Sequence, residues 1–515
     1  MVTATPENEV LIIGAGPTGL VLALWLARRG IRVRIIDKAA EPGMTSRALV
    51  VHARTLELYR QAGLADQVVE EGLRFDVINL WVRRTPVGRA VLGAMGEGLS
   101  PFPYLVIFPQ DQHERLLIER LGQAGVTVER GVELLGFDQL PGLVRVRLRH
   151  PDGREEICDN GYLAGCDGAR SRVREGLGTG FTGSTYQHLF YVADVESGGP
   201  LMNHELHVDI NESDFLAVFP LKGEGNARLI GIVENAGAEG KPLAWEDMRN
   251  GITERMGVQV ERVNWFSTYH VHHRVAGSFR KGRVFLLGDA AHIHSPVGGQ
   301  GMNTGIGDAV NLAWKLADVL RERSGADLLD SYEPERIAFA RRLVATTDRA
   351  FTAVTSDGLI AQTMRLRVVP RLIPTLFAIK AVRPYLFRTV SQTLINYRGS
   401  RLSEGRVGGV HGGDRLPWVT TNMGTNPTDN FAPVASMAWQ VHVYGEATGD
   451  LRSACAACQL SLHAFPWTDA ATRAGLRRDA VYLVRPDGYV ALADSTGSGE
   501  ALASYFDARP FLRRA

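Results

Sequence analysis

The chain has 515 residues, of which 57 are Lys or Arg and 56 are Asp or Glu, so its formal net charge is +1. At roughly 150 residues per domain, this length predicts about three domains, each able to bury a core. A nearly neutral chain has no overall field that would concentrate a polyanion, so nucleic acid is not an expected partner.

Glycine is unusually frequent, with 56 residues in the chain. An average composition of about 7% would give about 36. Glycine is required where the backbone adopts a positive φ or closely approaches a ligand, so the excess predicts several such positions.

The first residues, MVTATPENEV, lack the basic start and apolar core of a signal peptide. No run of about 18 apolar residues occurs, and four cysteines are too few for a disulfide scaffold. We therefore expect a cytoplasmic protein without stable membrane association. Residues 364–388 hold six basic residues and no acid, as a membrane-surface helix can, but three prolines favour helices packed on the first domain.

The N-terminal segment predicts a βαβ unit, with a buried strand at residues 10–13, a glycine turn, a helix at residues 20–30 and a strand ending at Asp37. Strand and helix patterns alternate to about residue 178. Short alternating strands then predict a β-rich layer at residues 181–274.

The strand, glycine turn and helix pattern of the N-terminal segment returns at residue 282, with a buried strand, a glycine loop and an amphipathic helix. The glycine-rich residues 405–417 are predicted to be a linker into a last unit of strands and a hairpin. The predicted fold class is therefore α/β.

A G-x-G-x-x-G turn formed by Gly14, Gly16 and Gly19 follows the first strand and opens a helix. Asp37 lies 18 residues after Gly19, at the end of the next strand. This arrangement predicts a dinucleotide, NAD or FAD, with its pyrophosphate at the helix N-terminus. A second match at residues 178–183 has no strand before it and no helix after it, which predicts a loop.

Two later segments favour FAD. Asp167-Gly168 and Gly288-Asp289 each end a predicted strand, and a glycine loop follows the second pair. Three such turns on separate strands imply one extended ligand across the carboxyl edge of a sheet. The residues resemble the flavin-dependent aromatic hydroxylases of the para-hydroxybenzoate hydroxylase type, in particular the polyketide and phenol hydroxylases with a C-terminal thioredoxin-like domain.

The resemblance implies a place for each part of FAD. The glycine turn would hold the pyrophosphate, Asp37 and Lys38 the adenosine ribose, and Asp289 the ribityl chain. Asp167 would lie near the pyrophosphate and the nicotinamide path, with helix capping as the alternative. The implied cofactor contacts are Gly14, Gly16, Gly19, Asp37, Lys38, Arg47, Gln110, Asp167, Asp289, Pro296, Gly299, Gly301, Met302 and Asn303.

The resemblance also implies the reaction. NADPH or NADH would bind transiently and reduce FAD, and a flavin hydroperoxide formed with molecular oxygen would hydroxylate an electron-rich ring. Backbone N–H groups near Gly301 would stabilise negative charge on the reduced flavin. The implied catalytic residues are Arg47, His52 and Pro296.

The catalytic base is left open by the sequence. Phenol hydroxylases carry an aspartate where this chain has Leu49, and His52 is the nearest polar residue. A structural role for His52, with a substrate acidic enough to need no base, is the alternative.

The substrate wall is expected in the β-rich layer. Phe215 and Phe219 share one face of a strand, and His270 is a further candidate, with core packing as the alternative for all three. The histidines of the YHVHHR segment have no companion carboxylate or cysteine, so no metal site is predicted.

The predicted division assigns residues 1–180 and 276–395 to an FAD-binding Rossmann-like domain, with part of the substrate layer near residues 73–105. Residues 181–275 form the inserted β-rich substrate domain, and residues 396–515 form the thioredoxin-like domain. In that last unit Cys455 and Cys458 fall within a helix rather than at its start, which favours a structural or homodimer-forming unit over dithiol chemistry.

The predicted function is an FAD-dependent, NAD(P)H-consuming monooxygenase that hydroxylates a small phenolic or polycyclic, polyketide-like aromatic compound. The alternatives are Baeyer–Villiger oxygenation or epoxidation on the same scaffold, a flavin disulfide reductase using Cys455 and Cys458, and a non-catalytic flavin sensor.

Overall fold

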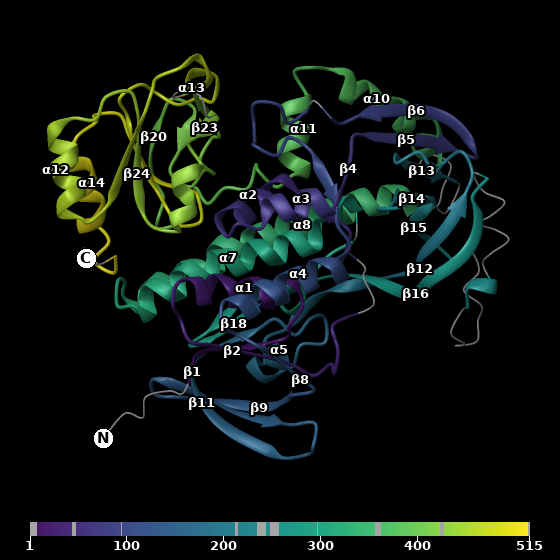
Figure 1. The fold of residues 1–515 in the computed structure, drawn as a ribbon, viewed down its shortest axis with the longest axis horizontal. Helices are drawn as coiled ribbons and strands as arrows, with labels where there is room; N and C mark the ends of the chain where they lie inside the picture. The colour runs from purple at the N-terminus through teal and green to yellow at the C-terminus, as the bar shows by residue number, and fades with distance from the viewer. Residues whose placement is uncertain are drawn as a thin grey trace.

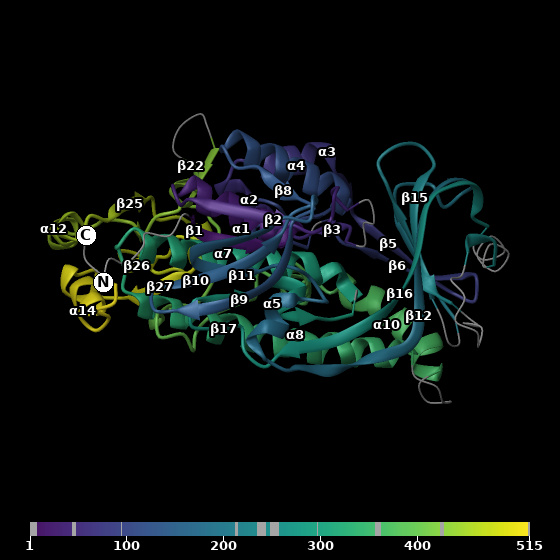
Figure 2. The same ribbon diagram turned by 90° about the horizontal axis from the view of Figure 1, so that it is seen from below.

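The computed structural model describes residues 8–43, 48–93, 95–211, 215–233, 244–247, 257–295, 297–355, 362–422 and 427–512. Three large sheets organise the described chain (Figures 1 and 2). In Figure 2 the first sheet and its helices lie between the C-terminal unit at one end and the long strands β12 and β16 at the other.

The first sheet has the order β17-β18-β11-β1-β2-β8, and β9 and β10 extend it from β11. Its strands are β1 (Asn8–Ile13), β2 (Val33–Asp37), β8 (Val128–Arg130), β9 (Glu133–Leu140), β10 (Leu143–Arg149), β11 (Glu155–Gly165), β17 (Arg280–Lys281) and β18 (Val284–Leu286). Val10, Leu11 and Ile12 are fully buried, as expected for a parallel strand inside an α/β unit.

Strands β8, β2, β1, β11 and β18 run parallel, so their carboxyl ends meet at one edge. The turns that follow Ile13, Gly165 and Leu286 therefore lie side by side, as the sequence predicts. Above them α1 (Pro17–Arg28) packs against α4 (Gln110–Gln123) and α7 (Gln300–Leu320), which Figure 1 shows crossing the middle of the molecule.

The second sheet is antiparallel except between β13 and β5, in the order β19-β16-β12-β15-β14-β13-β5-β6. Its strands are β5 (Val77–Val82), β6 (Thr85–Val91), β12 (Phe181–Gly198), β13 (Leu206–Ile210), β14 (Phe215–Pro220), β15 (Asn226–Ile232), β16 (Gln259–Ala276) and β19 (His292–Ile293). The edge strand β19 leads directly into the glycine loop before α7, so this sheet and the loop are covalently adjacent.

Shorter elements complete the first two units. A three-stranded sheet contains β3 (Val50–Val51), β4 (Leu73–Phe75) and β7 (Leu105–Ile107). The other helices there are α2 (Ala53–Gln61), α3 (Ala65–Glu71), α5 (Arg172–Leu177), α8 (Tyr332–Thr355), α10 (Val369–Ala378) and α11 (Arg383–Val390).

The two helices of the basic segment pack on different parts of the molecule. Helix α10 contacts β6 and β5 of the second sheet, where packing on the first domain was expected. Phe387 of α11 is buried in the core that contains β1, α1 and α7, in line with the expectation. A β-carbon on Gly88 would lie 2.5 Å from Cγ of Pro374, so this contact depends on a glycine in β6.

The third sheet has the order β21-β20-β27-β26-β24-β25. Its strands are β20 (Glu404–Val407), β21 (Val410–His411), β24 (Gln440–Tyr444), β25 (Ser461–Phe465), β26 (Val481–Val484) and β27 (Val490–Asp494), with helices α12 (Gly449–Ala457), α13 (Asp469–Arg473) and α14 (Gly499–Asp507). A separate pair contains β22 (Thr420–Asn422) and β23 (Pro427–Asp429).

The predicted linker at residues 405–417 is wrong, because β20 and β21 lie within it and belong to this sheet. A β-carbon on Gly405 would lie 2.2 Å from the carbonyl oxygen of Ala493, and one on Gly412 would lie 2.3 Å from the backbone nitrogen of Glu404. Glycine is present here because backbones pack closely, and not because the segment is flexible.

A buried cluster of charges joins the third sheet to α7 and α8. Arg485 donates to both oxygens of Glu335 at 2.8 and 3.0 Å, and Lys315 donates to Glu335 at 2.8 Å. Burial alone would raise the pKa of Glu335, but Arg485 and Lys315 hold it below its usual range. Trp314 on α7 donates to Asp487 at 3.0 Å, so the hairpin between β26 and β27 is tied to the helix.

We expect Arg485→Ala to lower the thermal midpoint, with a loss of about 3–5 kcal/mol, because Glu335 and Asp487 would remain buried with less compensation. Differential scanning calorimetry measures the midpoint. Arg145→Ala, which removes an exposed partner of Asp159, is the matched control and should leave the midpoint unchanged. Equal midpoints for both variants would contradict a stabilising role of the cluster.

Candidate FAD and substrate site

The glycine turn after β1 has the conformation and packing that its sequence predicts. Gly14 has φ of +102°, and a β-carbon there would lie 2.3 Å from the carbonyl oxygen of Cys166. A β-carbon on Gly19 would lie 2.0 Å from the carbonyl oxygen of Gly14. Gly16, the N-cap of α1, has no atom within 4 Å of such a position, so open space lies in front of it.

Asp37 ends β2 beside this turn, and Lys38 is exposed. The Asp37 carboxylate accepts hydrogen bonds from the backbone N–H of Ala15 at 2.7 Å and of Ala39 at 2.8 Å. Asp37 therefore holds the glycine turn against the end of β2.

Asp167 follows β11 and caps α5, the alternative role that the sequence left open. Its Oδ2 accepts from the backbone N–H of Arg172 at 2.7 Å and of Val173 at 3.2 Å. Its Oδ1 is buried with no partner among the described residues, and burial raises the pKa of this carboxyl group. One oxygen thus shapes the turn and the other remains available.

Arg174 connects the second and third turns, a role that sequence reasoning missed. Its guanidinium donates to the carbonyl oxygen of Ala169 at 2.8 Å and to that of Ala290 at 3.0 Å. Asp289, between Gly288 and Ala290, is exposed at this edge. The turns that carry Asp167 and Asp289 are therefore fixed relative to each other.

The loop before α7 uses two glycines with left-handed backbone, Gly298 (φ +77°) and Gly299 (φ +62°). Gly299 is the N-cap of α7 and no side chain caps the helix, so Gly301 and Met302 lie in an uncapped first turn. The first N–H groups of a helix have no partner within the helix and favour an anion.

Asn303 and His52 fasten this loop. Asn303 Nδ2 donates to the carbonyl oxygens of Val50 at 2.8 Å and Gly299 at 2.9 Å, and Oδ1 accepts from the backbone N–H of His52 at 3.0 Å. His52 Nε2 lies 3.0 and 3.1 Å from the carbonyl oxygens of Gly298 and Gly299, so Nε2 carries the proton. Burial lowers the pKa of His52 to about 4.

His294, which sequence reasoning did not single out, lies at the start of the same loop. Its Nδ1 lies 2.8 Å from the carbonyl oxygen of Ser295, and its buried Nε2 has no partner among the described residues. A β-carbon on Gly301 would lie 3.8 Å from that Nε2. The sequence feature that could have pointed to His294 is the HIHS segment directly after the Asp289 turn.

Four of the buried polar atoms without partners in the described chain lie at turns near the predicted cofactor site. Two of them follow strands of the first sheet, Arg130 Nη2 at the end of β8 and Asp167 Oδ1 after β11, whereas His52 Nδ1 follows β3 of the three-stranded sheet and His294 Nε2 follows β19 of the second sheet. Buried polar groups normally have partners. A ligand with polar groups along its length, such as FAD, would supply partners at these turns and would fill the open space at Gly16.

Gln110 begins α4 and joins the edge of the same site. Its Oε1 accepts from the backbone N–H of Ala48 at 3.4 Å, and its Nε2 donates to Glu114 at 2.8 Å. Arg47 and Pro296, also expected at the cofactor, lie outside the described residues.

The aromatic face of the second sheet contains Phe215 but not His270. The ring centroid of Phe190 lies 6.2 Å from that of Phe215 and 5.8 Å from that of Tyr269. His270 pairs with Leu189, one position out of phase with the Phe190–Tyr269 pair, so it lies on the opposite face and is exposed. Phe219 shares the Phe215 side of β14 and packs against the first core.

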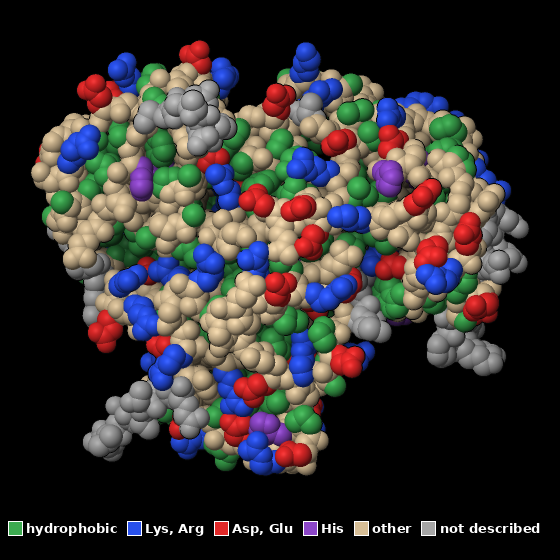
Figure 3. Space-filling view, in the orientation of Figure 1, with side chains coloured by type: hydrophobic (Ala, Val, Ile, Leu, Met, Phe, Trp, Pro, Cys, Tyr) green, Lys and Arg blue, Asp and Glu red, His purple; other side chains and the backbone are tan. Residues whose placement is uncertain are grey.

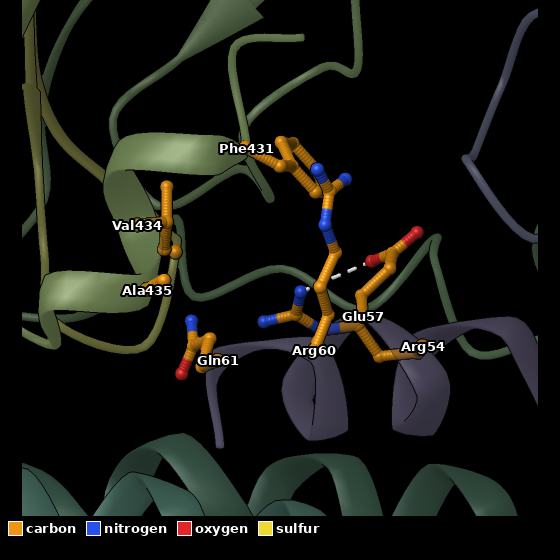
Figure 4. Close-up of a pocket in the computed structure, with 8 residues that line it drawn as sticks. Arg54, Glu57, Arg60, Gln61, Phe431, Val434 and Ala435 are labelled. Carbon is orange, nitrogen blue, oxygen red and sulfur yellow. Dashed lines mark hydrogen bonds and ion pairs between the residues drawn. The ribbon is translucent and has the colours of Figure 1, made fainter. Parts of the chain in front are cut away.

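A crevice lies between α2 and the C-terminal unit (Figure 4). It is lined by Arg54, Glu57, Arg60, Gln61, Phe431, Val434, Ala435 and Gly488. Its cations already have acidic partners, because Arg54 lies 3.1 Å from Glu57 and Arg60 lies 2.6 Å from Asp429. The crevice is therefore a domain junction rather than an anion site.

The cysteine pair does not have the environment of a redox dithiol. Cys455 is in the last turn of α12 and Cys458 follows the helix, and both are buried. Burial, and then the neighbouring Cys458, raise the pKa of Cys455 to about 11. Reactive thiolates are favoured at helix N-termini instead.

Among the described residues, no group of three metal-ligating side chains lies together, and no helix is long and apolar enough to span a membrane. Figure 3 shows acidic and basic side chains interspersed over one face, without a field of one sign.

Comparison with known proteins identifies the family. The family described as FAD binding domain matches residues 7–347, which include all three turns and the loop before α7. The chain belongs to this family. A 6-methylpretetramide 4-monooxygenase from Streptomyces rimosus is 37% identical over 436 residues, covering 81% of this chain and 76% of that protein.

Two further relatives cover nearly the whole chain. A flavin-dependent monooxygenase from Mycobacteroides abscessus is 32% identical over 96% of this chain and 98% of its own length. The solved structure of an anhydrotetracycline hydroxylase from Streptomyces rimosus is 28% identical, covers 99% of this chain and 100% of that one, and has a TM-score of 0.79. This family member is an FAD-dependent aromatic monooxygenase that uses a nicotinamide reductant and molecular oxygen.

Alanine substitutions at Gly16 and Gly19 of the glycine turn are expected to have different effects. Gly16→Ala should keep the thermal midpoint but weaken FAD binding about tenfold or more, because its β-carbon would enter the space where a pyrophosphate approaches. Gly19→Ala should lower the midpoint even without FAD, because its β-carbon overlaps the Gly14 carbonyl group. Scanning calorimetry and flavin-fluorescence titration separate the two effects. A Gly16→Ala protein that binds FAD like the parent would contradict the assignment.

The buried histidines predict loss of stability in acid. Burial lowers the pKa of His52 and His294 from 6.5 to about 4. The unfolded chain therefore takes up these protons first, and the stability present above about pH 6.5 falls towards pH 4 by up to about 1.4 kcal/mol per pH unit for each histidine. Thermal midpoints at pH 7, 6 and 5 measure the slope. His52→Asn should make it shallower, and an unchanged slope would contradict the prediction.

Proposed function

We propose that the protein hydroxylates a large, apolar phenolic substrate of the polycyclic, polyketide type, held between the aromatic face of the second sheet and the loop before α7. The observation that carries this proposal is the segment at residues 48–52, which contacts both. The carbonyl oxygen of Ala48 accepts from Arg228 of β15 at 3.5 Å, and His52 donates to the loop at Gly298 and Gly299. Relatives named for 6-methylpretetramide and anhydrotetracycline support a substrate of this kind.

The turns at the carboxyl edge of the first sheet support the following cofactor roles. The backbone of Gly14, Gly16 and Gly19 would bind the pyrophosphate, and Asp289 would accept hydrogen bonds from the ribityl hydroxyl groups. Gly301 and Met302 would present N–H groups to the negative charge that the flavin ring carries when FAD is reduced. Bound FAD supplies the redox chemistry. NAD(P)H is oxidised, one oxygen atom of O₂ is added to the aromatic ring of the substrate, and the other leaves as water.

The protein's own residues position and shield the reacting groups. His52 and Asn303 hold the loop at residues 298–303 in one shape, and the Phe190–Phe215 face excludes water from the substrate ring. An imidazole with a pKa of about 4 is a weak base, and Leu49 replaces the family aspartate. The proposed substrate is therefore a phenol that ionises without a protein base.

The proposed domain division follows the three sheets. The first sheet with α1, α4 and α7 is the FAD-binding domain, and residues 181–275 with β5 and β6 form the substrate domain. Residues 396–515 are proposed to be thioredoxin-like. Supporting features are parallel β24 and β25 joined through α12, the antiparallel hairpin of β26 and β27, and the following α14.

A turnover experiment tests the proposal. The FAD-loaded protein should consume NADPH or NADH and O₂ faster in the presence of an accepted multi-ring phenol, and mass spectrometry should show one added oxygen atom. NMR of the product distinguishes a hydroxyl group from the epoxide or lactone of the alternative reactions. Stimulation only by single-ring phenols would contradict the proposed substrate class.

Two variants test the assigned residues. Asp289→Ala should weaken FAD binding about tenfold or more, as expected for lost hydrogen bonds to a charged group, whereas exposed Asp152→Ala is the control. Cys458→Ser should leave hydroxylation unchanged. Loss of turnover in Cys458→Ser with FAD still bound would favour the disulfide reductase alternative.

A further inference from the structure

The acid at the end of β2 accepts hydrogen bonds from the protein backbone. In a dinucleotide fold this carboxylate is expected to accept hydrogen bonds from the adenosine ribose. Here one oxygen of Asp37 accepts from Ala15, inside the glycine turn, and the other accepts from Ala39. These two hydrogen bonds of Asp37 stabilise the shape of the glycine turn.

Arg130 lies next to Asp37 and has a donor without a partner. It ends β8 in register with Asp37, and its Nη1 lies 3.9 Å from Asp37 Oδ2, beyond hydrogen-bond length. Its Nη2 is buried and has no partner among the described residues, although the side chain is 17% exposed. A buried N–H of a guanidinium group without an acceptor is costly, so the position is suited to a ligand that supplies one.

The charge around Arg130 indicates what kind of ligand fits. Asp37 and the buried Glu114 both act on it, and Glu114 is itself held by Gln110 at 2.8 Å and by the backbone N–H of Gly43. One cation between two carboxyl groups does not form a phosphate site. A neutral group with hydrogen-bond acceptors, such as a purine nucleoside, matches this environment better.

We propose that Arg130 contributes to the recognition of the adenosine half of FAD beside Asp37, by donating from Nη2 to an acceptor of the nucleoside. Asp37 shapes the glycine turn, and its remaining lone pairs can accept from the same nucleoside. This inference rests on the proposed FAD site.

Flavin binding without turnover tests the inference. The apoprotein is titrated with FAD and with FMN, which lacks the adenosine half, and flavin fluorescence gives both dissociation constants. Arg130→Ala should raise the constant for FAD about 10- to 100-fold and leave that for FMN within about twofold. Arg130→Lys should lie between, because an ammonium group lacks the guanidinium fork. Exposed Arg115→Ala, on neighbouring α4, is the charge control.

Two results would overturn the inference. They are an Arg130→Ala protein that binds FAD like the parent, and a parallel loss of FAD and FMN affinity in that variant. A parent protein that binds FAD but oxidises no aromatic compound would contradict the proposed substrate and leave the Arg130 measurement decisive.

Discussion

The close approach of α1 to α7 and to the turn after β11 is the constraint on which the site depends. It is possible only because glycines stand at the contacts. A β-carbon on Gly305 would lie 2.3 Å from Oγ1 of Thr18, and one on Gly288 would lie 2.7 Å from the same atom. With Gly14 and Gly19 on the other side of α1, these contacts bring three turns and the loop before α7 to one edge.

Buried polar contacts then fix this arrangement where apolar packing alone would leave it adjustable. Arg174 ties the second turn to the third, and Asn303 with His52 ties the loop to α2. Further along α7, Trp314 and Lys315 connect the helix to Asp487 and Glu335 of the C-terminal junction. Helix α7, whose N-terminus is proposed to face the flavin, is therefore held along its length, which is the preorganisation that catalysis requires.

The sequence predicted well where a single local pattern decides the structure. The strand before Gly14, the end of β2 at Asp37 and the helix after Gly299 all follow from burial periodicity and turn chemistry. It predicted poorly where the decision depends on a distant segment. Part of residues 405–417 forms strands because β20 pairs with β27, in which the partner of Gly405 is Ala493, 88 residues later in the chain. His270 lies on the face opposite Phe190 because it pairs with Leu189, and this pairing joins residues far apart in the sequence.

By itself, the sequence determined a dinucleotide site and the positions of its glycines, because these depend on short motifs whose backbone geometry is local. The reaction class followed from the family resemblance that these motifs carry. Only the tertiary structure decided what the polar side chains do once the motifs meet. The motif assigns Asp37 to the ribose, and the structure shows that Asp37 also accepts from the N–H groups of Ala15 and Ala39, while Nη2 of Arg130 is buried without a partner among the described residues. Hydrogen bonding between elements depends on distances of a few tenths of an ångström, which no sequence spacing specifies.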